Sequence, residues 1–155
     1  MIGNDVIDLT LAQTESNWKK AGFLEKLFTD AEQHLIKSSI NPEQKVWELW
    51  SRKEAAYKIF NRNSGIRLYN PIQFECSDDG KFPKVIFGDQ VFFTQSVIDT
   101  FSIKTIAVAQ ISDFEKVIFL DNRAGIVKEN GIPSKNNKPI SISHHGRFEQ
   151  IISVL

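Results

Sequence analysis

Between residues 46 and 60, apolar residues recur with the period of an α-helix. On such a helix they form one arc, which consists of Val46, Leu49, Trp50, Tyr57 and Phe60. Asn41 and Pro42 suit the N-cap and the first position of this helix, and Gly65 suits its end. The pattern therefore predicts one long helix with a buried face.

Beyond residue 70 the pattern changes to a period of two, which is typical of β-strands. Strand-like runs follow one another at residues 72–76, 84–87, 91–94 and 102–109. Asp79 and Gly80 suit a hairpin turn, and residues 1–9 read as a further short strand. This order predicts an α+β domain with an antiparallel sheet packed against the long helix, rather than a doubly wound parallel sheet.

The connecting segments give weaker patterns. Thr29 and Glu32 have the spacing of a capping box, which predicts a helix through Ile36, and residues 10–26 are loosely helical. Toward the C-terminus we expect a short helix, a loop, a strand ending in a tight turn and a last strand, at residues 123–129, 131–137, 138–148 and 151–155. The pattern does not decide where residues 117–155 lie relative to the sheet.

Length and composition predict a single domain that spans residues 1–155. The chain is 41% hydrophobic and 25% charged, and its net charge is zero. No apolar run approaches the roughly 18–20 residues of a membrane span, and the N-terminus has neither a basic leader nor an apolar signal core. The single cysteine, Cys76, excludes an internal disulfide framework and a cysteine zinc site. These features predict a cytoplasmic protein with no membrane partner.

Charge is unevenly distributed around the long helix. Between residues 45 and 67 the sequence has six basic residues and two acidic ones. Such a cluster is typical of a solvated helix face, and it also suits an anionic ligand. The chain as a whole has no basic excess, which argues against a nucleic-acid partner.

Three charged residues of the helix raise a question of chemistry. Glu54 and Lys58 lie four residues apart beside the buried arc, so they project from the same edge. A surface pair of this kind stabilises a helix by a few tenths of a kcal/mol and needs no further role. Lys53 lies within the apolar arc itself. Because an unpaired buried ammonium is costly, its head must reach solvent or meet an anion.

The run from Trp50 to Lys58, W-S-x-K-E-A-x-x-K, resembles the motif of the 4′-phosphopantetheinyl transferase superfamily, (F/W)-(S/C/T/A)-x-K-E-(A/S)-x-x-K. Every position of that motif is filled. The resemblance implies that Glu54 binds Mg²⁺ and that Lys53 and Lys58 hold the phosphates of coenzyme A. It also implies the α+β fold of these transferases.

A second acidic motif lies at the N-terminus. The run from Gly3 to Val6, G-N-D-V, resembles the family's G-x-D-(I/V), which implies that Asp5 is the other magnesium ligand. By itself, an aspartate here would be read as the cap of a turn. The surfactin-type branch has a further carboxylate where this chain has Ile7, and Asp8 belongs to the opposite face of a strand. The chain thus resembles the short holo-acyl-carrier-protein synthase branch, with two carboxylates and with water completing the metal shell.

Residues 138–148 deliver a hydroxyl, imidazoles and backbone N–H groups into one turn, which suits phosphate. By default, a histidine pair in a turn is solvated and without a role. The run K-P-x-S-x-S-H-x-G resembles the family's S-x-S-H element, which implies that Ser143 and His144 contact coenzyme A. A zinc site is not indicated, because the chain has only three histidines and no thiolate spacing.

These resemblances imply an enzyme that moves the 4′-phosphopantetheine arm of coenzyme A to a serine of an apo acyl or peptidyl carrier protein, as in fatty acid biosynthesis. Mg²⁺ held by Asp5 and Glu54 would bridge the pyrophosphate, and Lys58 would stabilise the developing charge. The serine proton goes to Glu54 directly or through a metal-bound water. The alternative is a module that binds coenzyme A or another phosphorylated ligand without turnover.

The resemblance also bears on assembly. The long branch of the superfamily builds its site between two similar halves of one chain, and the short branch forms trimers with clefts between neighbours. This chain has one copy of each acidic motif, so we expect a homo-oligomer, with a trimer favoured. In the alternative, the extra residues before Lys138 fold over the cleft and complete it within one chain.

Overall fold

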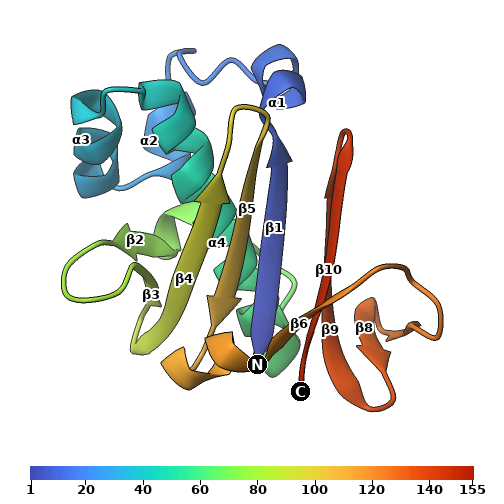
Figure 1. Ribbon diagram of the computed structural model, residues 1–155. Helices are drawn as coiled ribbons and strands as arrows, with labels where there is room; N and C mark the ends of the chain where they lie inside the picture. Colours follow the sequence, from blue (N-terminus) through green and yellow to red (C-terminus); the bar gives the residue numbers. More distant parts are fainter.

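Two antiparallel sheets of five strands each lie side by side, and the helices gather around the first sheet (Figure 1). The computed structural model describes residues 1–155. The first sheet has the strand order β1 (Ile2–Asp8), β5 (Ser102–Val108), β4 (Gln90–Ile98), β3 (Lys84–Phe87) and β2 (Glu75–Ser77). The second has the order β6 (Val117–Leu120), β10 (Phe148–Val154), β9 (Lys138–His145), β8 (Ile132–Lys135) and β7 (Val127–Glu129).

The helices are α1 (Leu9–Glu15), α2 (Phe23–Leu27), α3 (Asp30–Ser38) and α4 (Pro42–Ser64), with short 3₁₀ turns η1 (Pro71–Gln73) and η2 (Ile111–Lys116). The predicted α+β class, with an antiparallel sheet packed against a long helix, is confirmed. None of the helices combines the length and the apolar character that crossing a membrane requires.

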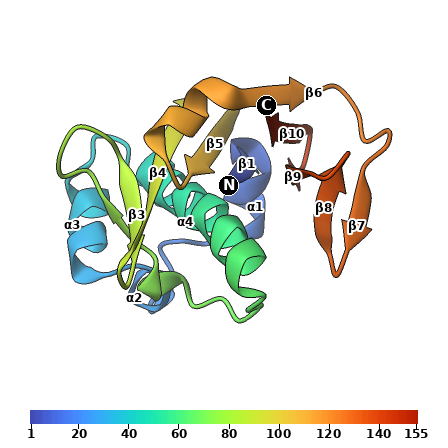
Figure 2. The same ribbon diagram turned by 90° about the horizontal axis from the view of Figure 1, so that it is seen from below.

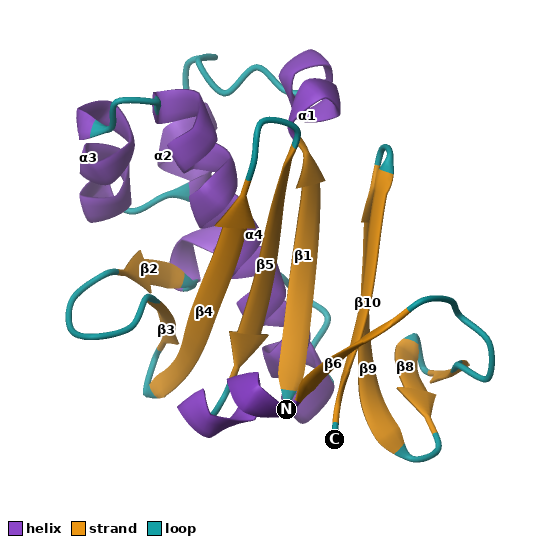
Figure 3. Cartoon of the chain, in the orientation of Figure 1, coloured by secondary structure: helices purple, strands orange, loops and turns teal.

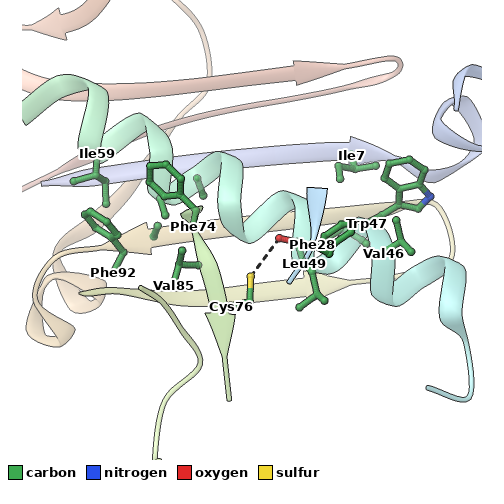
Figure 4. Packing of buried hydrophobic residues seen from close by; sticks show 14 of the residues in the cluster. Ile7, Phe28, Val46, Trp47, Leu49, Ile59, Phe74, Cys76, Val85 and Phe92 are labelled. Carbon is green, nitrogen blue, oxygen red and sulfur yellow. Dashed lines mark hydrogen bonds between the residues drawn. The ribbon is translucent and has the colours of Figure 1, made fainter. Parts of the chain in front are cut away.

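Helix α4 packs across the first sheet and carries much of the hydrophobic core (Figure 4). Its ends are as predicted: the Asn41 side chain accepts from the Gln44 N–H, and Gly65 ends the helix in the left-handed conformation. The helix approaches β1 so closely that a Cβ atom on Gly3 would lie 2.1 Å from the carbonyl oxygen of Ala55. This contact needs a glycine. The buried core includes Val46, Leu49, Ile59, Phe74, Val85 and Phe92.

Strand β1 is the element on which the two sheets meet. It pairs with β5 along one edge, while β9 and β10 of the second sheet pack against it (Figures 2 and 3). All of its residues are buried, including the polar side chains of Asn4, Asp5 and Asp8. Buried polar groups are almost always hydrogen-bonded, so β1 must find partners within the protein.

The C-terminal part differs from the sequence prediction. Residues 123–129 do not form a helix but lead into β7, and residues 131–137 include β8 rather than a loop. Both hairpins turn on two residues with positive φ, which are Asn130 with Gly131, and Asn136 with Asn137. Because such pairs match the twist of antiparallel strands, they outweigh the pattern that predicted a short helix at residues 123–129. In the loosely helical segment at residues 10–26, the structure has two short helices, α1 and α2.

Asp8 fastens the turn between β9 and β10 to the end of β1. Its carboxylate caps α1 by accepting from the N–H groups of Thr10 and Leu11. It also accepts from the backbone N–H and from Nε of Arg147, each at 3.0 Å. The hydrogen bonds from Arg147 lower the pKa of Asp8. Gly146 lies so close that a Cβ atom on it would be 2.5 Å from Oδ2 of Asp8. Asp8 is therefore committed to this turn and is no third carboxylate for the Asp5 site.

We expect Gly146→Ala to destabilise the protein more than Gly88→Ala, although both glycines have a positive φ, 55° and 58°. At Gly88 a Cβ atom meets nothing within 4 Å. The free energy of unfolding of Gly88→Ala should therefore fall only by the cost of a left-handed alanine, about 1–2 kcal/mol. Gly146→Ala adds the clash with Asp8. Urea denaturation of the two variants measures the difference, and equal losses would mean that the turn does not depend on Asp8.

Candidate active site

Asp5 of β1 and Glu54 of α4 line the same cavity, whose volume is about 340 Å³. The cavity lies where β1, α4, α1 and the end of β9 meet. Its other walls include Trp47, Trp50, His144 and His145. Residues from the beginning, the middle and the end of the sequence therefore share one cavity.

The two carboxylates are held in surroundings that disfavour their charge. Burial, and then the nearby charge of Asp5, raise the pKa of Glu54 to about 7. Burial also raises the pKa of Asp5, although the Lys58 ammonium opposes this effect. None of the salt bridges of the chain involves Asp5 or Glu54, so neither carboxylate is neutralised by direct contact with a basic side chain. A bound cation would offset the two negative charges.

Lys58 ties together the three elements around the acidic pair. Its ammonium donates to the carbonyl oxygens of Asn4 in β1 and Ile142 in β9, at 2.6 and 2.9 Å. Burial lowers the pKa of Lys58, while the charges of Asp5 and Glu54 act in the opposite direction. Because an ammonium has three N–H donors, one remains beyond these two bonds.

Side chains of β9 bind the free edge of β1. Successive N–H groups of this edge, on Asn4, Val6 and Asp8, donate to Ser141 Oγ, Ser143 Oγ and His145 Nδ1 at 3.0, 3.0 and 2.9 Å. Ser143 Oγ also donates to Oδ1 of Asp5, at 3.1 Å. The alternation S-x-S-x-H is visible in the sequence, but nothing local in the sequence indicates that its partner is β1.

A sequence model of the 4′-phosphopantetheinyl transferase superfamily, named ACPS, matches residues 1–110. The chain belongs to this superfamily. The match contains Asp5, Glu54 and Lys58, and it ends before the second sheet begins at Val117. The chain is therefore a phosphopantetheinyl transferase whose C-terminal sheet lies outside the matched region. No curated protein matches the sequence.

Solved structures of synthases from this superfamily have the same fold. The apo-ACPS structure from Chronobacterium ammoiniagenes has a TM-score of 0.56 and 15% identity, over 69% of this chain and 93% of that one. The holo-[acyl-carrier-protein] synthase from Helicobacter pylori, in complex with coenzyme A, has a TM-score of 0.54 and 16% identity, over 71% and 100%. The synthase from Thermotoga maritima has a TM-score of 0.54 and 12% identity, over 99% of this chain and 82% of that one.

In this transferase Lys53 is a structural residue. Its ammonium forms a salt bridge with Glu32 at 2.8 Å and donates to the Pro71 carbonyl oxygen at 2.9 Å. Both charged side chains are fully buried. The Lys53 ammonium therefore does not reach solvent but meets an anion, and this anion is the Glu32 carboxylate of the protein itself. Complete burial and pairing within the protein speak against the expected contact of Lys53 with a phosphate of coenzyme A.

Arg52 is one of the six basic residues between residues 45 and 67, but it does not face a ligand. Its guanidinium is buried, and it donates to Thr94 Oγ1 and Asp78 Oδ1. It also donates to the carbonyl oxygens of Ser77 and Lys84. Arg52, like Lys53, serves to fasten α4 to its surroundings. The basic cluster around the long helix is thus only partly a surface feature.

Ser143 and His144, which the family resemblance groups together, lie in different surroundings. The Ser143 hydroxyl is buried and its single donor goes to Asp5, so it does not fit the predicted contact with coenzyme A. His144 is exposed and lines the cavity beside the acidic pair. Contact with coenzyme A stays a prediction for His144 and Lys58.

Lys53→Met should lower the free energy of unfolding by about 3–5 kcal/mol, because it leaves the Glu32 carboxylate buried without a partner. The double variant with Glu32→Gln should lose less, since no unpaired charge remains. Urea denaturation tests both, and calorimetric titration with coenzyme A should find an unchanged affinity in folded Lys53→Met. A lower affinity at unchanged stability would contradict the structural role.

Proposed function

We propose that this protein transfers the 4′-phosphopantetheine arm of coenzyme A to a serine hydroxyl of an apo acyl or peptidyl carrier protein, with Mg²⁺ as cofactor. The observation that supports this most is the presence of Asp5 and Glu54 in one cavity with His144. The superfamily supplies the class of reaction. A synthase of the same fold has been solved in complex with coenzyme A.

The residues of the cavity fit Mg²⁺. This ion binds proteins through one or two carboxylates, keeps several waters and takes further ligands from substrate phosphates. No group of three or more histidine, cysteine or acidic side chains is placed so that it could hold a metal ion by itself. Asp5 and Glu54 would hold the ion, and it would neutralise charge on the pyrophosphate.

Phosphoryl transfer depends chiefly on positioning and on neutralising charge. A bond forms between the serine oxygen and a pyrophosphate phosphorus, and the bond to the departing adenosine 3′,5′-bisphosphate breaks. Lys58, held by carbonyl groups of β1 and β9, stabilises the charge that develops. Glu54 accepts the serine proton, since it is the more exposed of the two carboxylates. His144 contacts coenzyme A from the wall formed by β9.

A module that binds coenzyme A without turnover is the second candidate. It would use the same cavity, and the two candidates differ in their product. Incubation with coenzyme A, Mg²⁺ and an apo carrier, followed by mass spectrometry of the carrier, separates them. A carrier that gains the mass of phosphopantetheine only when Mg²⁺ is present supports the transferase, and binding without any gain supports the module.

The residues that line the cavity all come from one chain. The hairpin of β9 and β10 supplies the wall that carries His144. The expectation of a homo-oligomer assumes that the cleft borrows a missing wall from another copy of the chain. The alternative had the residues before Lys138 fold over the cleft, but the tail residues that line the cavity are His144 and His145, at the end of β9. A trimer stays a prediction, but the cavity does not require one.

Asp5→Asn and Glu54→Gln should each lower Mg²⁺-dependent transfer by about 100-fold or more, because each removes a metal charge and nearly conserves shape. The fold should be retained, as judged by circular dichroism. Asp89→Asn is the matched control, since it removes an exposed carboxylate far along the first sheet in the β3–β4 turn. Transfer is followed by the mass of the carrier. Near-full activity in either site variant would show that the proposed metal site is wrong.

Chains carrying Glu54→Gln and chains carrying His144→Ala should not restore activity when they are co-refolded, because each cavity takes both walls from one chain. If the site were shared between copies, some cavities would take an unaltered Glu54 from one chain and an unaltered His144 from the other, and would be active. The assay is run at a coenzyme A concentration below the KM of the unaltered protein, where His144→Ala alone should be weakest. Activity above the sum of the two variants would show that the walls come from different chains.

A further inference from the structure

We propose that Ser143 is a positioning residue, which orients the Asp5 carboxylate for a divalent cation. This inference rests on the proposed function of Asp5 as a metal ligand. It assigns Ser143 a role in metal binding instead of the contact with coenzyme A that the motif implied. The supporting observations are the hydrogen bonds of Ser143, its burial, and the different partners of its neighbour Ser141.

The Ser143 hydroxyl makes two hydrogen bonds to β1, one to the Asp5 side chain and one to the backbone beside it. It donates to the Oδ1 atom of Asp5 at 3.1 Å, and it accepts from the N–H of Val6, the next residue along β1, at 3.0 Å. Ser143 is only 7% exposed, so water cannot readily replace it. The hydroxyl therefore restrains the carboxylate and the backbone next to it at the same time.

These bonds leave part of the carboxylate free. An ionised carboxylate has about four lone-pair sites on two oxygens, and Ser143 takes one site on Oδ1. Metal-binding carboxylates are commonly held by such a hydrogen bond, and loss of the outer partner typically costs about 10–100-fold in metal affinity or activity. Ser143 stands in this relation to Asp5, although it comes from the opposite end of the sequence.

Ser141 provides a natural comparison on the same strand. Its hydroxyl accepts from the N–H of Asn4 at 3.0 Å and donates to Oδ1 of the Asn4 side chain at 2.7 Å. Both serines are buried, lie two residues apart on β9, accept from an N–H of β1 and donate to a side-chain oxygen of β1. Ser141 makes both bonds to Asn4, whereas Ser143 bonds the N–H of Val6 and the carboxylate of Asp5, which lines the cavity.

Binding of Mn²⁺, used as a probe for Mg²⁺, tests the proposal without any turnover. The electron paramagnetic resonance signal of free Mn²⁺ gives the affinity of the unaltered protein and of each variant. Ser143→Ala should bind Mn²⁺ about 10–100-fold more weakly. Ser141→Ala should keep the affinity of the unaltered protein, and Ser143→Thr should recover it because the hydroxyl is retained. Urea denaturation should give similar losses of stability for both alanine variants.

The outcomes separate this proposal from the proposed function. If Ser143→Ala binds Mn²⁺ as tightly as Ser141→Ala does, Ser143 has no positioning role, and the Asp5 site itself is unaffected. If Glu54→Gln binds Mn²⁺ as tightly as the unaltered protein, or if the unaltered protein binds none, the metal site is wrong and both proposals are overturned. Should Ser143→Ala fail to fold, weaker Mn²⁺ binding by Ser143→Cys, whose thiol is a poor donor, supports the proposal and unchanged binding refutes it.

Discussion

The free edge of β1 is the constraint on which the rest of the structure depends. The strand is buried and pairs with only one neighbour, β5. A buried N–H without a partner costs about 1–3 kcal/mol, and the free edge presents such groups on Asn4, Val6 and Asp8. Alternate side chains of β9 accept from all three. The second sheet is therefore joined to the first through side chains, and this joint also positions the residues of the cavity.

The joint has a consequence for the chemistry. Neighbouring residues of a strand face opposite sides, so Ser143 and His145 bind β1 while the His144 side chain points away from that edge. Both histidines line the cavity. Lys58 reinforces the same arrangement by donating to carbonyl oxygens on both strands. Stability of the joint and completeness of the site are thus two results of one set of contacts.

Helix α4 reaches its position through polar anchors as well as through its apolar face. Lys53 meets Glu32, Arg52 meets Thr94 and Asp78, and the Ser51 hydroxyl donates to Thr105. Glu32 also accepts from the Cys76 N–H, so α3, α4 and β2 converge on a single carboxylate. Removing one partner of such a buried pair costs more than the pair contributes, which makes the helix intolerant of small shifts. Glu54 directly follows these anchored residues.

The sequence by itself determined the local elements and the identity of the acidic pair. The limits of α4, the capping box at Thr29 and the strand β3 follow from caps and periodicity, which act over a few residues. Asp5 and Glu54 could be selected because their motifs are local too. The Asn-rich turns of the tail were equally local signals, and a loosely helical pattern obscured them.

Only the tertiary structure decided which polar side chains face the cavity and which face the protein. Lys53 and Ser143 belong to motifs that suggest a ligand, yet their partners, Glu32 and Asp5, lie on other elements far along the chain. The same holds for the wall that the tail contributes in cis. A motif records residue type and spacing, whereas the partner of a buried polar group depends on which distant segment packs against it. The packing of the whole chain decides which distant segment lies beside a buried polar group, and no pattern within one segment indicates it.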